Sequence, residues 1–210
     1  MAGRALELAS HAALVDRPRG ATALLVLAHG AGAGMRHPFM AELAGELAAR
    51  RIATVRWEFR YMTAGKRRVD PPEVAEASVA AVWAEVRRRY PRLPAFAGGK
   101  SFGGRMTSRA HAAAALPGLR GLIFVGFPLH PAGRPGTERA EHLSRAAGPM
   151  LFVQGTRDAL CDLALLRPVV RGLGPRATLV TIDRADHGLD RSGAIAELGE
   201  NIASWIADRL

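Results

Sequence analysis

A serine between two glycines lies where an apolar, extended stretch meets a helical run. The segment Gly99-Lys100-Ser101-Phe102-Gly103 follows the stretch 93–98 and precedes residues 105–115, which have helical character. A G-x-S-x-G segment in that context is typical of a nucleophile elbow, a tight turn that holds a serine hydroxyl above the end of a sheet. Glycines are needed there because a larger side chain would collide with neighbouring backbone. The pattern predicts nucleophilic chemistry at Ser101.

Two polar turns further along carry the acid and the base that a serine nucleophile needs. Asp158 follows an apolar segment at 150–154. His187 follows a second one at 178–182. Open α/β sheets place their ligands just beyond the carboxyl ends of strands. A histidine takes the hydroxyl proton, and a carboxylate holds the imidazole in the right tautomer. The order Ser101, Asp158, His187 therefore predicts a catalytic triad.

Three other aspartates compete with Asp158 for the role of the acid. Asp162 lies four residues beyond it, and Asp183 and Asp186 precede His187. Neighbouring side chains on a loop seldom face each other, which weighs against Asp186. Because Asp158 lies just past an expected strand, we predict that it is the acid of the triad.

An oxyanion hole requires two backbone N–H groups that converge on the developing negative oxygen. The first is expected from Phe102, directly after the nucleophile. The second is expected from the small-residue loop 29–34, which follows an apolar segment at 24–28. Within that loop Ala31 is the first choice as donor and Gly32 the second.

Several residues near these turns are candidates for the wall of a substrate cleft: His29, Gly30, Gly32, Lys100 and His130. For His130 a turn-capping role beside Pro131 explains the sequence equally well. Lys100, Arg105 and Arg157 lie close to the triad in sequence and would favour an anionic acyl group. The alternative for these three is solvated or structural charge.

Apolar segments alternate with amphipathic ones along the whole chain, which indicates a mostly parallel sheet with helices on both faces. Strands are expected at 5–8, 24–28, 52–57, 95–98, 122–126, 150–154 and 178–182. Three helical stripes are expected: Phe39, Met40, Leu43 and Leu47; Val74, Ser78, Val82 and Val86; Ile195, Leu198, Ile202, Trp205 and Ile206. Prolines flank the second stripe, at 71–72 before it and at 91 after it, as expected at the two ends of a helix.

Length and composition bound the remaining possibilities. With 210 residues, 49% of them hydrophobic, the chain can bury a full core as one domain spanning 1–210. The single cysteine, Cys161, forms no internal disulfide. No signal-peptide pattern and no apolar run of bilayer length are present, so a cytoplasmic location without membrane contact is expected.

The net charge of +10 does not by itself indicate a nucleic-acid partner. Lys66 and Lys100 are the only lysines, and joint enrichment in arginine and alanine more often reflects codon composition than a binding surface. The basic clusters 66–68 and 87–89 are short and lack interleaved aromatic residues. We expect no specific nucleic-acid binding. The sequence leaves the oligomeric state open.

No cofactor or metal is expected. The histidines are scattered, no H-E-x-x-H segment or cysteine pair occurs, and the glycines of the 29–34 loop do not follow the dinucleotide-binding spacing.

These motifs together resemble the α/β-hydrolase superfamily over nearly the whole chain. Segments 29–40, 99–106, 126–131 and 152–158 more narrowly resemble the hydrolase-like domain of testis-expressed protein 30, which NSL complex subunit 3 and many small bacterial proteins share. A more distant resemblance is to dienelactone-hydrolase-like enzymes, which use cysteine where Ser101 stands. The resemblance implies an α/β-hydrolase fold. Since 126–149 has room for only one short helix, no lid domain is expected.

Two functions follow as hypotheses. The first is a serine hydrolase of the carboxylesterase or thioesterase type, which cleaves a small acyl substrate through an acyl-enzyme intermediate. The second is a non-catalytic protein-interaction module that keeps the fold, because eukaryotic proteins with the resembling domain are known mainly as complex components.

Overall fold

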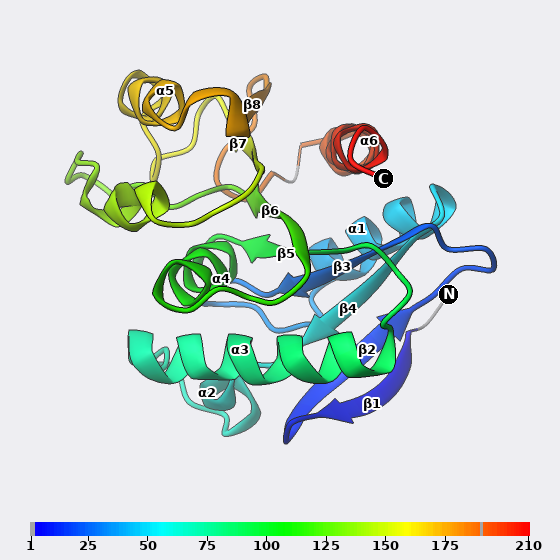
Figure 1. Ribbon diagram of the computed structural model, residues 1–210. Helices are drawn as coiled ribbons and strands as arrows, with labels where there is room; N and C mark the ends of the chain where they lie inside the picture. Colours follow the sequence, from blue (N-terminus) through cyan, green and yellow to red (C-terminus); the bar gives the residue numbers. More distant parts are fainter. Residues whose placement is uncertain (1–2, 190) are drawn as a thin grey trace.

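A mostly parallel sheet organises the chain (Figure 1), whose computed structural model describes residues 3–189 and 191–210. Its eight strands lie in the order β1-β2-β4-β3-β5-β6-β7-β8. All neighbours from β4 to β8 are parallel, whereas β1 and β2 run antiparallel to their neighbours. The strands are β1 Arg4–Leu8, β2 His11–Asp16, β3 Ala23–Ala28, β4 Ile52–Trp57, β5 Ala95–Lys100, β6 Leu119–Val125, β7 Met150–Gly155 and β8 Ala177–Ile182.

Helices cover both faces of this sheet, as predicted (Figure 1). Alternate residues of β3 enter different cores, which shows how one strand is buried on both sides. Leu24 and Val26 pack in the core beneath α3 (Pro72–Arg89) and α4 (Phe102–Ala113). Leu25 and Leu27 pack in the core beneath α1 (Pro38–Ala49) and α6 (Ala194–Ala207). The remaining helices are short: α2 Arg60–Thr63, η1 Glu138–Ser144, α5 Leu163–Gly172 and η2 Gly174–Arg176.

The predicted strands all occur, with ends that differ by at most three residues. The sequence interpretation missed β2 and α2, and it allowed for a helix between Asp158 and His187 without giving the bounds of α5. β2 is polar at both ends, and α5 contains Pro168 in its interior, which in a sequence argues against a helix. In the described residues the connection from β6 to β7 contains only η1 and no inserted lid.

One helical stripe was partly wrong. Helix α3 begins at Pro72 and ends at Arg89, as its flanking prolines indicated, but Val74 is exposed. The buried face adds Val79 and Trp83 to the predicted stripe. Residues spaced strictly by four drift by about 40° per step around a helix of 3.6 residues per turn, so such a row leaves the buried face. In the described part of the chain no helix is both long and apolar enough to cross a bilayer.

A buried ion pair fastens the N-terminal hairpin to the parallel part of the sheet. Arg56 on β4 donates to Asp16 on β2 through Nη2 at 2.8 Å and Nε at 3.2 Å. The two side chains are only 4% and 8% exposed. Arg56 Nη1 also donates to the carbonyl oxygen of Met35 at 2.9 Å. The pair therefore joins two strands and the loop that precedes α1.

Substitution of Asp16 by alanine is expected to lower the free energy of unfolding by about 3–5 kcal/mol, because a buried guanidinium loses its counter-charge. Urea unfolding followed by circular dichroism measures this. The double variant Asp16→Leu/Arg56→Met removes both charges and should recover much of the loss. The surface control Glu200→Ala should cost no more than about 0.5 kcal/mol. An Asp16→Ala protein as stable as Glu200→Ala would contradict the structural role of the pair.

A buried histidine makes the packing of η1 against α4 sensitive to acid. Nε2 of His142 lies 2.7 Å from Oγ of Ser108 on α4. Burial first, and then the positive charges of Arg109, Arg105 and Arg145, lower the pKa of His142 to about 4. This is below the value of about 6.5 for an exposed histidine. Neutral His142 therefore stabilises the fold above about pH 6.5, and that contribution is lost as the pH falls toward about 4.

The variant His142→Gln keeps a polar partner for Ser108 but does not titrate. Between pH 7 and pH 4 the wild-type protein should lose more stability than this variant, measured as the urea midpoint at several pH values. A parallel decline of the two proteins would show that His142 does not cause the acid sensitivity.

Candidate active site

The turn that carries Ser101 is strained at a single residue. Ser101 directly follows β5 and precedes the first residue of α4, with φ 49° and ψ −114°. Residues other than glycine rarely adopt that conformation, and it persists only where surrounding contacts enforce it. The Ser101 N–H donates to the carbonyl of Val125 at 3.0 Å, and the Ser101 carbonyl accepts from the N–H of Arg105 at 3.1 Å. The geometry is that of a nucleophile elbow.

The flanking glycines allow this turn to touch the end of β3. A Cβ at Gly99 would lie 2.3 Å from the carbonyl oxygen of Ala28. A Cβ at Gly103 would lie 2.5 Å from the carbonyl oxygen of His29 and 2.6 Å from that of Ala28. Backbone atoms cannot yield as a flexible side chain does. Only glycine therefore lets β5 and α4 approach the loop that follows β3.

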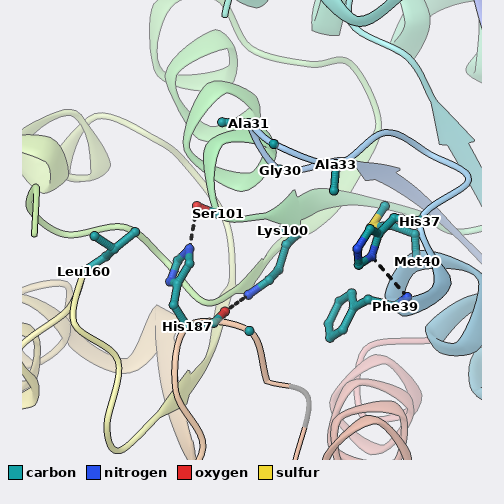
Figure 2. A pocket seen from close by; sticks show the side chains of 12 residues that line it. Gly30, Ala31, Ala33, His37, Phe39, Met40, Lys100, Ser101, Leu160 and His187 are labelled. Atoms are coloured by element: carbon teal, nitrogen blue, oxygen red, sulfur yellow. Dashed lines mark hydrogen bonds between the residues drawn. The ribbon is translucent and has the colours of Figure 1, made fainter. Parts of the chain in front are cut away.

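The structure brings the three predicted triad residues into one hydrogen-bonded series. Nε2 of His187 lies 2.9 Å from Oγ of Ser101 (Figure 2). Nδ1 of His187 lies 2.7 Å from Oδ2 of Asp158. The Asp158 side chain is fully buried, whereas that of His187 is 27% exposed. With the Nδ1 proton donated to the carboxylate, Nε2 is the atom that accepts the serine proton. This arrangement can activate a hydroxyl for nucleophilic attack.

The carboxylate of Asp158 is held by further donors. The backbone N–H of Leu160 donates to Oδ1 at 2.8 Å. The side-chain amide of Gln154 donates to Oδ2 at 2.5 Å. Gln154 is fully buried at the end of β7, and its Oε1 has no hydrogen-bond partner among the described residues. Its amide nitrogen thus faces the carboxylate and orients Asp158 toward His187.

The three competing aspartates have different partners. Asp162 caps α5 by accepting from the N–H of Ala164 at 2.8 Å. Asp186 accepts from the N–H of Gly188 at 2.7 Å, within its own turn. Asp183 accepts from the hydroxyl of Thr156 at 3.4 Å.

A pocket of about 340 Å³ opens beside Ser101. Apolar side chains from α1 and from two loops form most of its wall, as Figure 2 shows. Its lining residues are Gly30, Ala31, Gly32, Ala33, His37, Phe39, Met40, Lys100, Ser101, Leu160, His187 and Gly188. Three cleft candidates, Gly30, Gly32 and Lys100, are in this wall.

Two predicted cleft residues lie outside this wall. His29 is fully buried; its Nε2 accepts from the N–H of Phe59 at 3.1 Å, and burial lowers its pKa, which favours the neutral ring. His130 is also buried, and its Nε2 accepts from the N–H of Asp162 at 2.9 Å. Each histidine connects two loops, because its ring nitrogen accepts a hydrogen bond from a backbone N–H that would otherwise be buried without a partner. The turn-capping interpretation of His130 fits this contact.

The orientation of the loop after β3 favours the predicted oxyanion donors. The hydroxyl of Tyr61 donates to the carbonyl oxygens of Gly30 at 3.3 Å and Ala31 at 3.0 Å. In a trans peptide the N–H points away from the preceding carbonyl. The N–H groups of Ala31 and Gly32 therefore point away from Tyr61. Phe102 is the first residue of α4, so its N–H has no acceptor within the helix.

Sequence reasoning missed several residues of this site. Tyr61 lies on the four-residue helix α2, which has no recognisable pattern. Phe39 and Met40 were interpreted only as helix packing, yet they also line the pocket. Gln154 ends an apolar strand segment, and a polar amide at that position was the available signal in the sequence. Among the described residues, no group of three or more acidic, histidine or cysteine side chains could hold a metal ion.

Comparison with known proteins identifies the fold. The profile of the family described as alpha/beta hydrolase domain matches residues 21–207. A serine hydrolase homologue from Coxiella burnetii has a TM-score of 0.78 at 21% identity, covering 96% of this chain and 95% of its own. Dienelactone hydrolase from Anabaena variabilis has a TM-score of 0.82 at 18% identity, covering 100% and 98%. A serine hydrolase without a lid from Xanthomonas campestris has a TM-score of 0.76 at 22% identity, covering 99% and 95%. At these identities the structural likeness concerns the fold alone.

The variant Gln154→Leu should slow covalent labelling of Ser101 by a fluorophosphonate probe about 10- to 100-fold, as expected for one lost hydrogen bond to a charged group. Asp158→Asn should slow it by on the order of 10⁴-fold, because the imidazole tautomer is then wrong. Labelling rates from intact-mass spectra measure both effects. Asp183→Asn is the matched control and should label at the wild-type rate. An unchanged rate in Gln154→Leu would exclude the orienting role.

Proposed function

This chain belongs to the alpha/beta hydrolase domain family, and on that premise we propose that it is a serine hydrolase that cleaves a small acyl ester or thioester. The observation that carries the proposal is the hydrogen-bonded series from Asp158 through His187 to Ser101, which ends at a pocket of about 340 Å³. A positioned base and an accessible hydroxyl are the two requirements of covalent acyl transfer.

Acylation begins when His187 Nε2 removes the proton of Ser101 as Oγ attacks the carbonyl carbon. The carbonyl electron pair moves onto its oxygen, which accepts hydrogen bonds from the N–H groups of Phe102 and Ala31, with Gly32 as the second choice for the latter. Collapse of this intermediate breaks the bond to the alcohol or thiol. The imidazolium returns its proton to that leaving group, and Ser101 carries the acyl chain.

Deacylation repeats these steps with water as the nucleophile. His187 takes a proton from water while the water oxygen attacks the acyl carbon. The bond from that carbon to Ser101 Oγ then breaks, and the imidazolium gives its proton to Oγ. Asp158 stays ionised throughout and stabilises the imidazolium in both halves of the reaction. The products are the free acid and the regenerated hydroxyl.

The pocket supports a short acyl chain. Phe39 and Met40 close one side and Leu160 the other, so apolar surface surrounds the space next to Ser101. Because no inserted segment covers the pocket in the described residues, a small substrate can enter directly from solvent.

A second candidate is a protein-interaction module without turnover. The narrower resemblance to the hydrolase-like domain of testis-expressed protein 30 suggests it, and one observation favours it. His29 and His130, which belong to the resembling motifs, contact backbone groups rather than the pocket. Those motifs would therefore be retained for folding even without catalysis.

Replacement of Ser101 by alanine should reduce hydrolysis of short-chain esters and thioesters by on the order of a thousandfold or more, since the nucleophile is removed. It should also abolish fluorophosphonate labelling. Colorimetric turnover with acetyl and butyryl substrates, together with intact mass, measures both.

Ser108→Ala is the matched control, because Ser108 Oγ also contacts a histidine but lies buried on α4 outside the pocket. It should keep both activity and labelling. Absence of labelling on the folded wild-type protein would favour the interaction module. Unchanged turnover in Ser101→Ala would overturn the serine mechanism.

A further inference from the structure

The sheet ends at β8 in an edge whose outer side has no partner strand. β8 is the last strand in the sheet order and pairs only with β7 (Figure 1). Successive residues of a strand direct their N–H and C=O groups to opposite sides. The Ile182 carbonyl accepts from the N–H of Thr156, which follows β7, so Ile182 and Val180 face β7. The backbone groups of Leu179 and Thr181 therefore face outward, where no strand of the described chain pairs with them.

β8 lacks the usual protection of a free edge. Natural sheets keep edge strands from pairing with charged side chains, with proline or with a covering element. β8 has the sequence Ala-Thr-Leu-Val-Thr-Ile, with no charge and no proline, and residues 177–181 are partly exposed. The opposite edge differs, because β1 carries Arg4 and Glu7, and Arg89 donates to the Glu7 carbonyl at 3.2 Å. β8 is therefore the edge that can accept another strand.

A groove of about 430 Å³ lies between this edge and α5. Its lining residues are Arg167, Val170, Arg171, Gly174, Ala177 and Leu179. The two arginines are exposed, and their side chains form no hydrogen bond or ion pair with any residue that the structure describes. They stand four residues apart on one helix, so their like charges repel each other. The groove thus presents two positive charges and no acid among its lining residues.

A third arginine flanks the opposite face of β8. Trp205 of α6 donates through Nε1 to Oγ1 of Thr178 at 3.3 Å, so its ring lies beside the first half of the strand. The guanidinium carbon of Arg209 lies over that ring, 4.0 Å from the centroid. Asp183 follows the carboxyl end of β8 and pairs with Arg184 at 3.4 Å. Arginine side chains therefore flank the amino-terminal half of β8 on both faces.

We propose that the outer side of β8 binds an extended acidic segment of a partner protein, which adds one strand to the sheet. Main-chain hydrogen bonds to Leu179 and Thr181 hold such a segment in place. Its side chains alternate between the two faces of the sheet, so carboxylates at every second position meet Arg167 and Arg171. A guanidinium can donate two parallel hydrogen bonds to a carboxylate. A segment with glutamate at alternate positions and valine between them matches both the edge and the groove.

A second copy of this chain fits the edge less well. Antiparallel pairing of two β8 strands about a two-fold axis would place both α5 helices on the same face of the joined sheet. Arg167 and Arg171 of both copies would share that face, and each chain carries a net charge of +10. Like charges oppose such a pairing, whereas an acidic segment neutralises them. The inference is independent of the proposed hydrolase function, because β8 contributes no residue to the pocket at Ser101.

The first test measures binding of a fluorescein-labelled peptide, Glu-Val-Glu-Val-Glu-Val-Glu, to the full chain by fluorescence anisotropy. It should bind at least about 10-fold more tightly than the matching peptide with glutamine in place of glutamate, as expected for charge-assisted hydrogen bonds. Arg167→Gln/Arg171→Gln should remove most of this difference. Arg67→Gln/Arg68→Gln is the matched control, because it removes two exposed positive charges elsewhere and should keep the difference.

The second test shows whether the peptide binds as a strand. Alternate N–H groups of a strand face the same neighbour, so N-methylation of one alternate set blocks pairing with β8 and methylation of the other set does not. One methylated peptide should bind about as tightly as the parent, and the other at least about 10-fold more weakly.

Equal binding of the two methylated peptides would overturn the proposal. Equal binding of the glutamate and glutamine peptides, or the same loss in both double variants, would also overturn it. A dimer in sedimentation that the acidic peptide does not dissociate would assign the edge to a second copy instead. None of these results bears on turnover at Ser101, so failure here is distinct from failure of the hydrolase function.

Discussion

This site depends on the direct packing of two backbone segments that have no side chain between them. The turn at Ser101 lies against the carbonyl groups of Ala28 and His29, at distances that admit no Cβ on Gly99 or Gly103. This contact holds Ser101 in a conformation that a free chain would rarely adopt. It also sets the distance between the serine hydroxyl and the loop after β3. The nucleophile and the proposed oxyanion donors are therefore positioned by one contact.

Buried polar groups then hold that loop in shape. Tyr61 draws two loop carbonyls inward, and His29 accepts a backbone proton from Phe59. At the far end of the loop, Met35 is held on both sides: Glu58 accepts from its N–H at 2.9 Å, and Arg56 donates to its carbonyl at 2.9 Å. The strands β2 and β4 thereby influence the pocket although neither contributes a side chain to its wall. Hydrogen bonds that Met35 makes with Arg56 and Glu58 therefore order a loop that has no regular secondary structure.

The carboxyl ends of the parallel strands explain why three distant residues meet. Ser101 follows β5, Asp158 follows β7, and His187 follows β8. Parallel strands joined by helices end at the same edge of the sheet, so turns far apart in sequence become neighbours. Lys100 lies at the same edge because it ends β5. The same edge brings a nucleophile, a base, an acid and a cation into one space.

The sequence by itself determined the parallel sheet, its helices on both faces and the order of Ser101, Asp158 and His187 along the chain. Those properties depend on local periodicity and on turns next to strands, which are readable within a short window. Tertiary structure alone decided that His29 and His130 point into packed interiors, that Gln154 faces the carboxylate, and that Tyr61 orients the loop. It also decided that Lys100, and neither Arg105 nor Arg157, lines the pocket. Each of these depends on contacts between segments that are far apart in sequence. The direction in which a single side chain points produces no periodic pattern in the sequence, so it could not be predicted.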